Sequence, residues 1–219
     1  GFFFFFESGT FFFKSSGLLR RTTRDTFPES AIIQGEPMQQ IVPHLGSPGV
    51  FFCIRGFNSG VFRSTDRGAT WEPWSEILPF VPGPMVIGDG GVVHIYTFAV
   101  SADSYIAKSD ANGAITYLSY LGGASNEQVV RIFTNSDGQL VVTGNTDSMD
   151  YPRTEEPLSG EAGTNIPFTP FPAFDMFVTT LNPDGSLASS LVIGGPAADT
   201  LIYAAPGKEN SVTLFGVAN

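Results

Sequence analysis

Two polar stretches of the sequence carry residue types that could do chemistry. The stretch "RSTDRGATW", residues 63–71, holds one acid, two bases and three hydroxyls beside a tryptophan. The stretch "DSMDYPRTEE", residues 147–156, holds four carboxylates next to Tyr151 and Arg153. Glycoside hydrolysis uses two carboxylates at a fixed separation, or an arginine cluster with a tyrosine nucleophile. Each stretch is therefore a candidate site for that reaction.

The first stretch also has the composition of a tight turn. An aspartate at a turn can accept backbone N–H groups, and a following glycine can adopt the left-handed conformation. The spacing resembles the Asp-box (BNR) repeat, Ser/Thr-x-Asp-x-Gly-x-Thr-Trp, of sialidases and other β-propellers. The matching residues are Ser64, Asp66, Gly68, Thr70 and Trp71. In that family the box is a folding element away from the catalytic centre, so the resemblance implies a structural role.

Composition limits the classes of partner. The chain has 219 residues, with 11 basic against 21 acidic residues and a formal net charge of −10. Nucleic-acid binding rests on Lys and Arg that neutralise phosphates, so no nucleic-acid partner is expected. No apolar run approaches the roughly 20 residues of a membrane helix, so no membrane insertion is expected. The single cysteine, Cys53, lies in an apolar run and is expected to be a small buried residue.

The C-terminal half repeats itself after 72 residues. Residues 103–123 overlay residues 175–195 without a gap, and the register continues until Gly144 falls on Gly216. Each copy holds a hairpin turn whose glycine suits a positive φ. With the next two strands, the first copy is expected to form one four-stranded meander. The positions assigned to structural repeat turns are Asp103, Gly113, Gly122, Gly123, Asp175, Asp184, Gly185, Gly194 and Gly195.

These copies resemble the SBBP β-propeller repeats of bacterial, mostly secreted proteins. The matching pieces are "DSYIAKSDANGAITYLSYLGG", "LVVTGNTDSMDYP" and "DMFVTTLNPDGSLASSLVIGG", within the region from Asp103 to the end. The second copy departs from the family pattern where residues 189–192 replace Tyr-Ser-Thr-Tyr. The resemblance implies a propeller, seven-bladed as the family name says, located outside the cell or at its surface.

The apolar strands of the N-terminal half agree with this fold. Runs such as "GFFFFF" and "VFFCI" would aggregate as exposed edges, whereas stacked blades bury both faces of a sheet. We predict an all-β chain, a single partial β-propeller domain over residues 1–219. Its four-stranded antiparallel blades are expected at about 1–40, 41–86, 87–158 and 159–219. Both ends are expected to be cuts through a longer protein, with the signal peptide and the remaining blades outside this sequence.

The long Pro- and Gly-rich loop after residue 146 is the strongest candidate for binding. Aromatic rings in a loop can stack on a sugar or clamp a peptide. The candidate residues are Tyr151, Arg153, Phe168 and Phe171. The alternative is a loop folded down over a blade edge. The acidic turns "SDANG", "NSDGQ" and "NPDGS" are interpreted as hairpins rather than calcium loops, so no metal site or cofactor is assigned, and bound calcium elsewhere is left open.

The sequence therefore predicts an extracellular, non-catalytic propeller module that binds a glycan or a protein through its face loops. The alternative is a fragment of a sialidase-like or other propeller glycoside hydrolase. Turnover that depends on the carboxylates of residues 147–156 would favour the enzyme, whereas saturable binding without turnover would favour the module. No catalytic residue is assigned.

Overall fold

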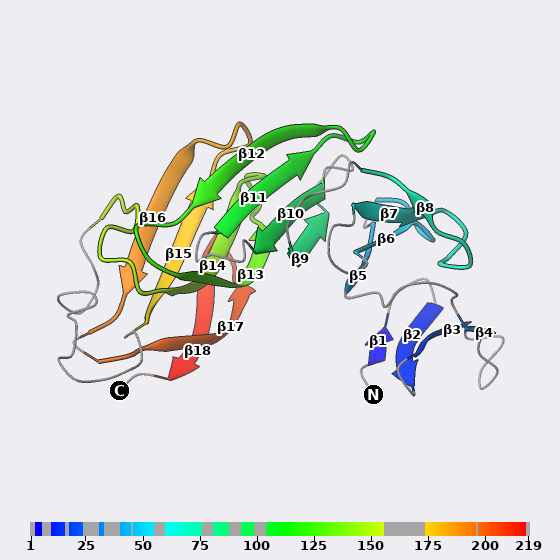
Figure 1. Cartoon of the computed structure of the whole chain (residues 1–219), viewed down its shortest axis with the longest axis horizontal. Helices are drawn as coiled ribbons and strands as arrows, with labels where there is room; N and C mark the ends of the chain where they lie inside the picture. The colour runs from blue at the N-terminus through cyan, green and yellow to red at the C-terminus, as the bar shows by residue number, and fades with distance from the viewer. Residues whose placement is uncertain are drawn as a thin grey trace.

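The computed structural model of the chain is built from β-strands joined by turns (Figure 1). Every regular element of the described residues is a strand, in keeping with a sequence rich in Phe, Gly and Pro. Side chains are described for residues 40–44, 46–54, 60–75, 85–87, 104–155, 174–195 and 197–217. The backbone alone is described for strands at 3–5, 10–15, 18–23, 31–32, 81–84 and 93–98.

The described strands form four four-stranded antiparallel sheets and one two-stranded sheet. The first sheet holds β1 (Phe3–Phe5), β2 (Thr10–Ser15), β3 (Leu18–Thr23) and β4 (Ala31–Ile32). The second holds β5 (Gln40–Pro43), β6 (Phe51–Ile54), β7 (Val61–Ser64) and β8 (Glu72–Pro73). The third holds β9 (Val81–Ile87), β10 (Val93–Phe98), β11 (Ser104–Ser109) and β12 (Ile115–Leu121). The fourth holds β13 (Glu127–Thr134), β14 (Leu140–Thr146), β15 (Asp175–Leu181) and β16 (Leu187–Ile193), and the last holds β17 (Thr200–Pro206) and β18 (Val212–Val217).

The sheets follow one another around an open arc. In Figure 1 the arc runs from β1–β4 through β5–β8 and β9–β12 to β13–β16, with β17–β18 beside the fourth sheet. An apolar cluster that includes Phe52 and Ala107 joins the second and third sheets, and one that includes Ile106 and Phe177 joins the third and fourth. Four-stranded antiparallel sheets stacked face to face in this way form a partial β-propeller. The predicted fold class is confirmed.

The 72-residue repeat is visible in the strands. β11 and β12 correspond to β15 and β16, and β13 and β14 correspond to β17 and β18. A bulge in β13 recurs at the matching place in β17. Glycine is needed opposite each bulge, because a Cβ on Gly144 would lie 2.3 Å from the Gln128 oxygen and one on Gly216 would lie 2.5 Å from the Thr200 oxygen.

The sheet boundaries differ from those expected at 87–158 and 159–219. The third sheet ends at Leu121, and the fourth continues across the long loop because Thr146 in β14 pairs directly with Asp175 in β15. Residues 104–146 thus supply two strands to each of two sheets, rather than the single four-stranded meander expected. Hairpin turns are written in local sequence, whereas pairing across a long connection depends on distant packing.

The described connections lie at two ends of the sheets. The turns at 110–114, 135–139, 182–186 and 207–211 close hairpins, and we call their side the hairpin end. Antiparallel pairing places the links that follow Leu121, Thr146 and Ile193 at the opposite side, which we call the crossover end. The polar candidates of residues 147–155 lie at the crossover end.

Candidate functional site

The turn between β7 and β8 contains the Asp-box residues. The Ser64 hydroxyl donates to Asp66 Oδ1 at 2.8 Å and accepts the Gly68 N–H at 2.8 Å. The Thr70 N–H donates to Asp66 Oδ1 at 2.9 Å, and the Thr70 hydroxyl donates to Asp66 Oδ2 at 2.6 Å. Both carboxylate oxygens are therefore engaged by groups of the same turn.

Trp71 connects this turn to the core of the second sheet. Its Nε1–H donates to the Gly68 carbonyl oxygen at 3.1 Å. Its ring packs against a cluster of Ile41, Phe51 and Cys53. Cys53 is buried, as expected from its apolar run. These contacts are those of an element that closes a hairpin and covers a core.

The electrostatics of Asp66 follow from the same hydrogen bonds. Burial raises the pKa of this carboxyl, but the hydrogen bonds from Thr70 and Ser64 outweigh it and lower the pKa to about 2. Asp66 is therefore ionised at neutral pH and held by its turn. A general acid needs a proton near neutral pH, so this carboxyl is badly suited to that role.

The acidic segment that follows β14 is bound to the link between the third and fourth sheets. Three successive backbone amides of residues 124–126 donate to side chains of residues 147–150. The Ala124 N–H donates to Asp150 Oδ1 at 2.8 Å, the Ser125 N–H to Ser148 Oγ at 2.8 Å, and the Asn126 N–H to Asp147 Oδ1. A Cβ on Gly123 would lie 2.6 Å from Ser148 Cβ, so a larger residue there would force this segment to shift. These carboxylates join two loops.

Tyr151 is a buried residue of the interface between the third and fourth sheets. Its side chain is 2% exposed, and its ring stacks on Phe177 with 4.7 Å between centroids. Its hydroxyl shares a 2.8 Å hydrogen bond with Thr179 Oγ1. The prediction that Tyr151 is an exposed binding residue is wrong, because its side chain is buried against the fourth sheet.

The remaining loop candidates divide into two groups. Arg153 is exposed at the crossover end, so it keeps its place as a binding candidate. Phe168, Phe171 and the repeat position Asp103 lie outside the described residues.

The repeat glycines at the hairpin end occupy matching turns. Gly113 has a φ of 90° and Gly185 a φ of 87°, the positive values for which glycine is suited. Each turn abuts the preceding sheet: a Cβ on Gly113 would lie 1.9 Å from the Trp74 oxygen, and one on Gly185 would lie 2.3 Å from the Tyr117 ring. The Ser186 hydroxyl and N–H both donate to Asp184, which lowers the pKa of that exposed carboxyl.

The repeat glycines at the crossover end meet buried carboxylates. A Cβ on Gly122 would lie 2.1 Å from Glu127 Oε2, and one on Gly194 would lie 1.9 Å from Asp175 Oδ1. The Gly195 N–H donates to Asp199 Oδ2 at 2.9 Å. Asp199 matches Glu127 in the 72-residue register. Each sheet-to-sheet link thus brings small residues close to acidic side chains at the strand ends.

The acidic turns bind their own backbone. Asp110 Oδ1 accepts the N–H groups of Asn112 at 2.8 Å and Ala114 at 3.0 Å. Asn135 Oδ1 accepts the Gln139 N–H at 3.0 Å. Within the described residues, no group of three or more His, Cys, Asp or Glu side chains is arranged to hold a metal ion.

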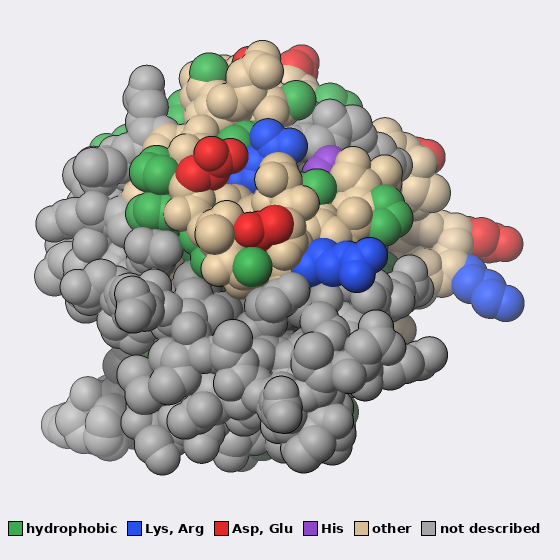
Figure 2. Space-filling model, turned by 90° about the vertical axis from the view of Figure 1, so that its right-hand side faces the viewer, with side chains coloured by type: hydrophobic (Ala, Val, Ile, Leu, Met, Phe, Trp, Pro, Cys, Tyr) green, Lys and Arg blue, Asp and Glu red, His purple; other side chains and the backbone are tan. Residues whose placement is uncertain are grey.

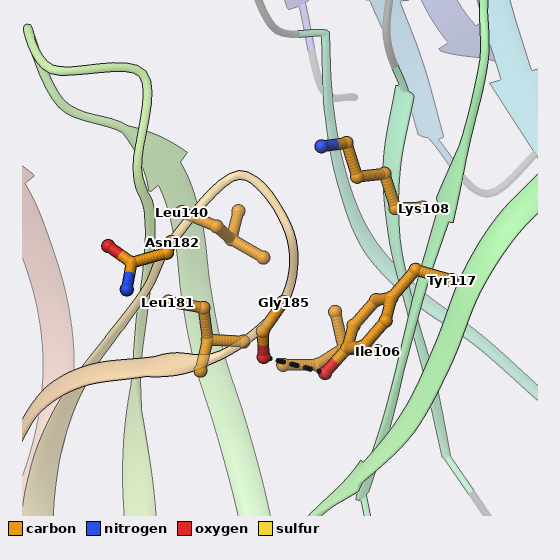
Figure 3. A pocket seen from close by; sticks show the side chains of 7 residues that line it. All are labelled: Ile106, Lys108, Tyr117, Leu140, Leu181, Asn182 and Gly185. Carbon is orange, nitrogen blue, oxygen red and sulfur yellow. Dashed lines mark hydrogen bonds between the residues drawn. The ribbon is translucent and has the colours of Figure 1, made fainter.

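A small pocket lies between β11–β12 and the turn after β15 (Figure 3). Its lining includes Ile106, Tyr117 and Leu181, and the Tyr117 hydroxyl donates to the Gly185 oxygen at 3.1 Å across it. The pocket has a volume of about 10 Å³, which is room for about one water molecule. It is an inter-sheet gap rather than a substrate site.

The outer part of the third sheet carries an exposed apolar face that the sequence did not single out. Leu118 and Tyr120 on β12 are 51% and 67% exposed. The Tyr120 ring contacts Tyr105 of β11, with 4.3 Å between centroids. We call Tyr105, Leu118 and Tyr120 the β12 face. Its alternation of apolar residues was visible in "ITYLSYL", but the sequence could not show that this side of the strand stays uncovered.

The described surface carries both signs of charge. Figure 2, which views the molecule from the β5–β8 side, shows acidic and basic side chains next to one another over the described residues, without a large area of one sign. Among the described residues, the structure has no helix with the length and apolar character needed to span a membrane.

Comparison with known proteins shows the fold and leaves the family open. No protein-family model and no curated protein matches the chain. A solved structure of YCF48 bound to a D1 peptide is similar, with a TM-score of 0.57 and 13% identity, over 95% of this chain and 58% of that one. A streptogramin B lyase is similar with a TM-score of 0.48 and 10% identity, over 97% of this chain and 81% of that one. YCF48 is a β-propeller, and at 13% identity its likeness to this chain shows the fold alone.

Proposed function

We propose that the chain is a non-catalytic binding module that recognises a partner protein. The observation that carries the proposal is the β12 face, where Tyr105, Leu118 and Tyr120 gather on the outer part of one sheet. Tyrosine supplies contact area at low entropic cost and is enriched in protein interfaces. YCF48, whose fold is similar, was solved with a bound peptide, and this supports a protein ligand.

The candidate catalytic groups support the same proposal. Asp66 is engaged by its own turn, and Asp147 and Asp150 bind backbone amides of the neighbouring link. Tyr151, the candidate nucleophile, is buried between two sheets. In a hydrolase these side chains would have to face the substrate. Here they bind or pack against other parts of the chain instead.

Paired arrays of folded proteins and of glycans test the proposal. We expect saturable retention on one or a few proteins, no retention on glycans, and no turnover of aryl glycosides. Hydrolysis that disappears in both Asp147→Asn and Asp150→Asn would contradict it and favour the glycosidase alternative. We also propose, from the repeat resemblance, that the protein acts outside the cell, which fractionation of the native source would test.

A further inference from the structure

The fourth sheet shows how one sheet of this chain receives the next. Phe133 and Val141 form one apolar cluster with Leu201 and Ala204 of β17. Arg131 adds a polar contact at the same interface, because its Nη1 donates to the Ala204 oxygen at 2.6 Å. These contacts hold the last sheet against the fourth, at the end of the arc in Figure 1.

The last sheet carries an equivalent face on its own outer side. In the 72-residue register, its positions 203, 205, 213, 215 and 217 correspond to positions 131, 133, 141, 143 and 145 of the fourth sheet. The strand pairing agrees, because Tyr203 lies opposite Phe215 as Arg131 lies opposite Thr143. We call the following residues the outer face of the last sheet: Tyr203, Ala205, Thr213, Phe215 and Val217.

The outer face of the last sheet is exposed and uncharged. Phe215 is 64% exposed, and about half of Val217 is exposed as well. Arg131 lies 4.8 Å from the centroid of the Tyr203 ring, and 51% of the Tyr203 side chain still remains exposed. Neither β17 nor β18 contains a charged residue. Exposed apolar patches mark interaction sites, and the equivalent face of the fourth sheet is covered by a sheet, so the occupant expected here is also a sheet.

The edge of β18 points to the same occupant. Among the strands that the structure describes, β18 pairs with β17 alone. Its equivalent, β14, pairs on its other side with β15 along the whole length from Leu140 to Thr146. An open strand edge is a template for a further strand. A hairpin like β15–β16 at the edge of β18 would complete a four-stranded sheet like the other four.

We propose that the last sheet binds a further 72-residue repeat of the same protein. Its first hairpin pairs with β18 as β15 pairs with β14, and its last two strands cover Tyr203 and Phe215 as β17 and β18 cover the fourth sheet. A repeat of the same chain is favoured over a separate molecule, because covalent linkage raises the effective concentration of the added strands. The inference goes beyond the proposed function, since it concerns the assembly of the fold and not the ligand.

The chemistry of the outer face defines how this repeat is held. Tyr203 and Val217 stand where the fourth sheet has Arg131 and Asn145, whose side chains bind backbone groups of β17. The next interface therefore replaces these hydrogen bonds with apolar packing. The strands that cover it are expected to present apolar side chains, as β17 does with Leu201.

A fusion protein tests the cover of the outer face. Asn219 falls on Asp147 in the register, so a second copy of residues 148–219 fused behind Asn219 continues the repeat without a gap. Thr213→Cys in the original part provides a probe on the outer face, and the native Cys53 is buried. Alkylation of the new cysteine by iodoacetamide should be about tenfold slower, or more, in the fusion than in the unfused chain. Thr116→Cys, an exposed position of β12, is the matched control and should change by less than about twofold.

A shorter fusion, with a copy of residues 148–195 alone, tests the pairing with β18. It supplies the hairpin without the covering strands, so alkylation of Thr213→Cys should stay within about twofold of the rate in the unfused chain. Its urea midpoint should lie above that of a control fusion with Val178→Pro and Thr179→Pro in the added copy only. Consecutive residues of a strand point their N–H groups to opposite sides, so one of the two prolines removes a donor to β18.

Each result decides part of the inference. Unchanged alkylation of Thr213→Cys in the long fusion would overturn the cover, and equal midpoints of the short fusion and its proline control would overturn the pairing with β18. A wild-type dimer that Phe215→Ser dissociates in sedimentation would assign the outer face to a second copy instead. If the Thr116→Cys rate rises in the long fusion, that fusion has not folded, and the short fusion decides. Retention on the protein array is independent of these results, so the proposed function would stand.

Discussion

Asn145 of β14 binds both backbone groups of Leu201 in β17. Its Oδ1 accepts the Leu201 N–H at 2.6 Å, and its Nδ2–H donates to the Leu201 oxygen at 3.3 Å. Asn145 is buried, so the pair is shielded from water. One amide side chain thus links the fourth sheet to the last one by two hydrogen bonds.

Replacing this amide should destabilise the protein. Asn145→Ala leaves a buried N–H and a buried carbonyl without this partner, and we expect a loss of about 2–4 kcal/mol in the free energy of unfolding. Urea unfolding followed by circular dichroism measures it. Asn182→Ala, which removes an amide of the hairpin end, is the control and should cost less than about 1 kcal/mol. Equal midpoints for the wild type and Asn145→Ala would show that the Leu201 contact is dispensable.

The buried aromatic at position 151 should behave as core. Tyr151→Ala removes the ring stacked on Phe177 and should cost about 3–5 kcal/mol, whereas Tyr151→Phe loses one hydrogen bond and should cost about 1 kcal/mol. Thermal and urea unfolding give both values. Tyr120→Ala, at an exposed position, should cost less than about 1 kcal/mol. A Tyr151→Ala protein as stable as Tyr120→Ala would mean that the Tyr151 ring is not packed in the core.

Replacing a glycine that another part of the backbone approaches closely should cost more stability than replacing a glycine that only needs a positive φ. Gly144→Ala places a methyl group 2.3 Å from the Gln128 oxygen, and the overpacking should cost about 3 kcal/mol. Gly138→Ala meets open space at a φ of 72° and should cost about 1–2 kcal/mol of backbone strain. The two unfolding free energies should keep this order. The reverse order would contradict the bulge geometry assigned to β13 and β14.

The sequence predicted what is local and what repeats. The 72-residue register located matching strands, bulges and turns, and Gly113 and Gly185 have matching positive φ values. The register did not predict how the strands divide into sheets. In the sequence the long link after Thr146 looks like a boundary, although β14 and β15 pair across it. The exposure of Tyr120 was equally hidden, since Tyr120 and the buried Val192 occupy the same register position.

The stability of the Asp66 turn should depend on pH. The carboxyl has a pKa of about 2 in the folded chain against 3.8 for the unperturbed group, so folding favours the ionised form. A depressed folded pKa contributes stability that is present above about pH 4 and is lost as the pH falls toward 2. Because Asp66 is exposed to solvent, the contribution is about 1 kcal/mol after screening.

The unfolding free energies of the wild type and Asp66→Asn, compared at pH 6 and at pH 2, isolate the contribution of the Asp66 carboxylate, since the other titrations cancel. The difference should be about 1 kcal/mol at pH 6 and close to zero at pH 2. Thr70→Val, which removes the hydroxyl donor to Oδ2, should show a smaller pH dependence than the wild type. A difference between the wild type and Asp66→Asn that does not change with pH would mean that the turn does not select the charged carboxylate.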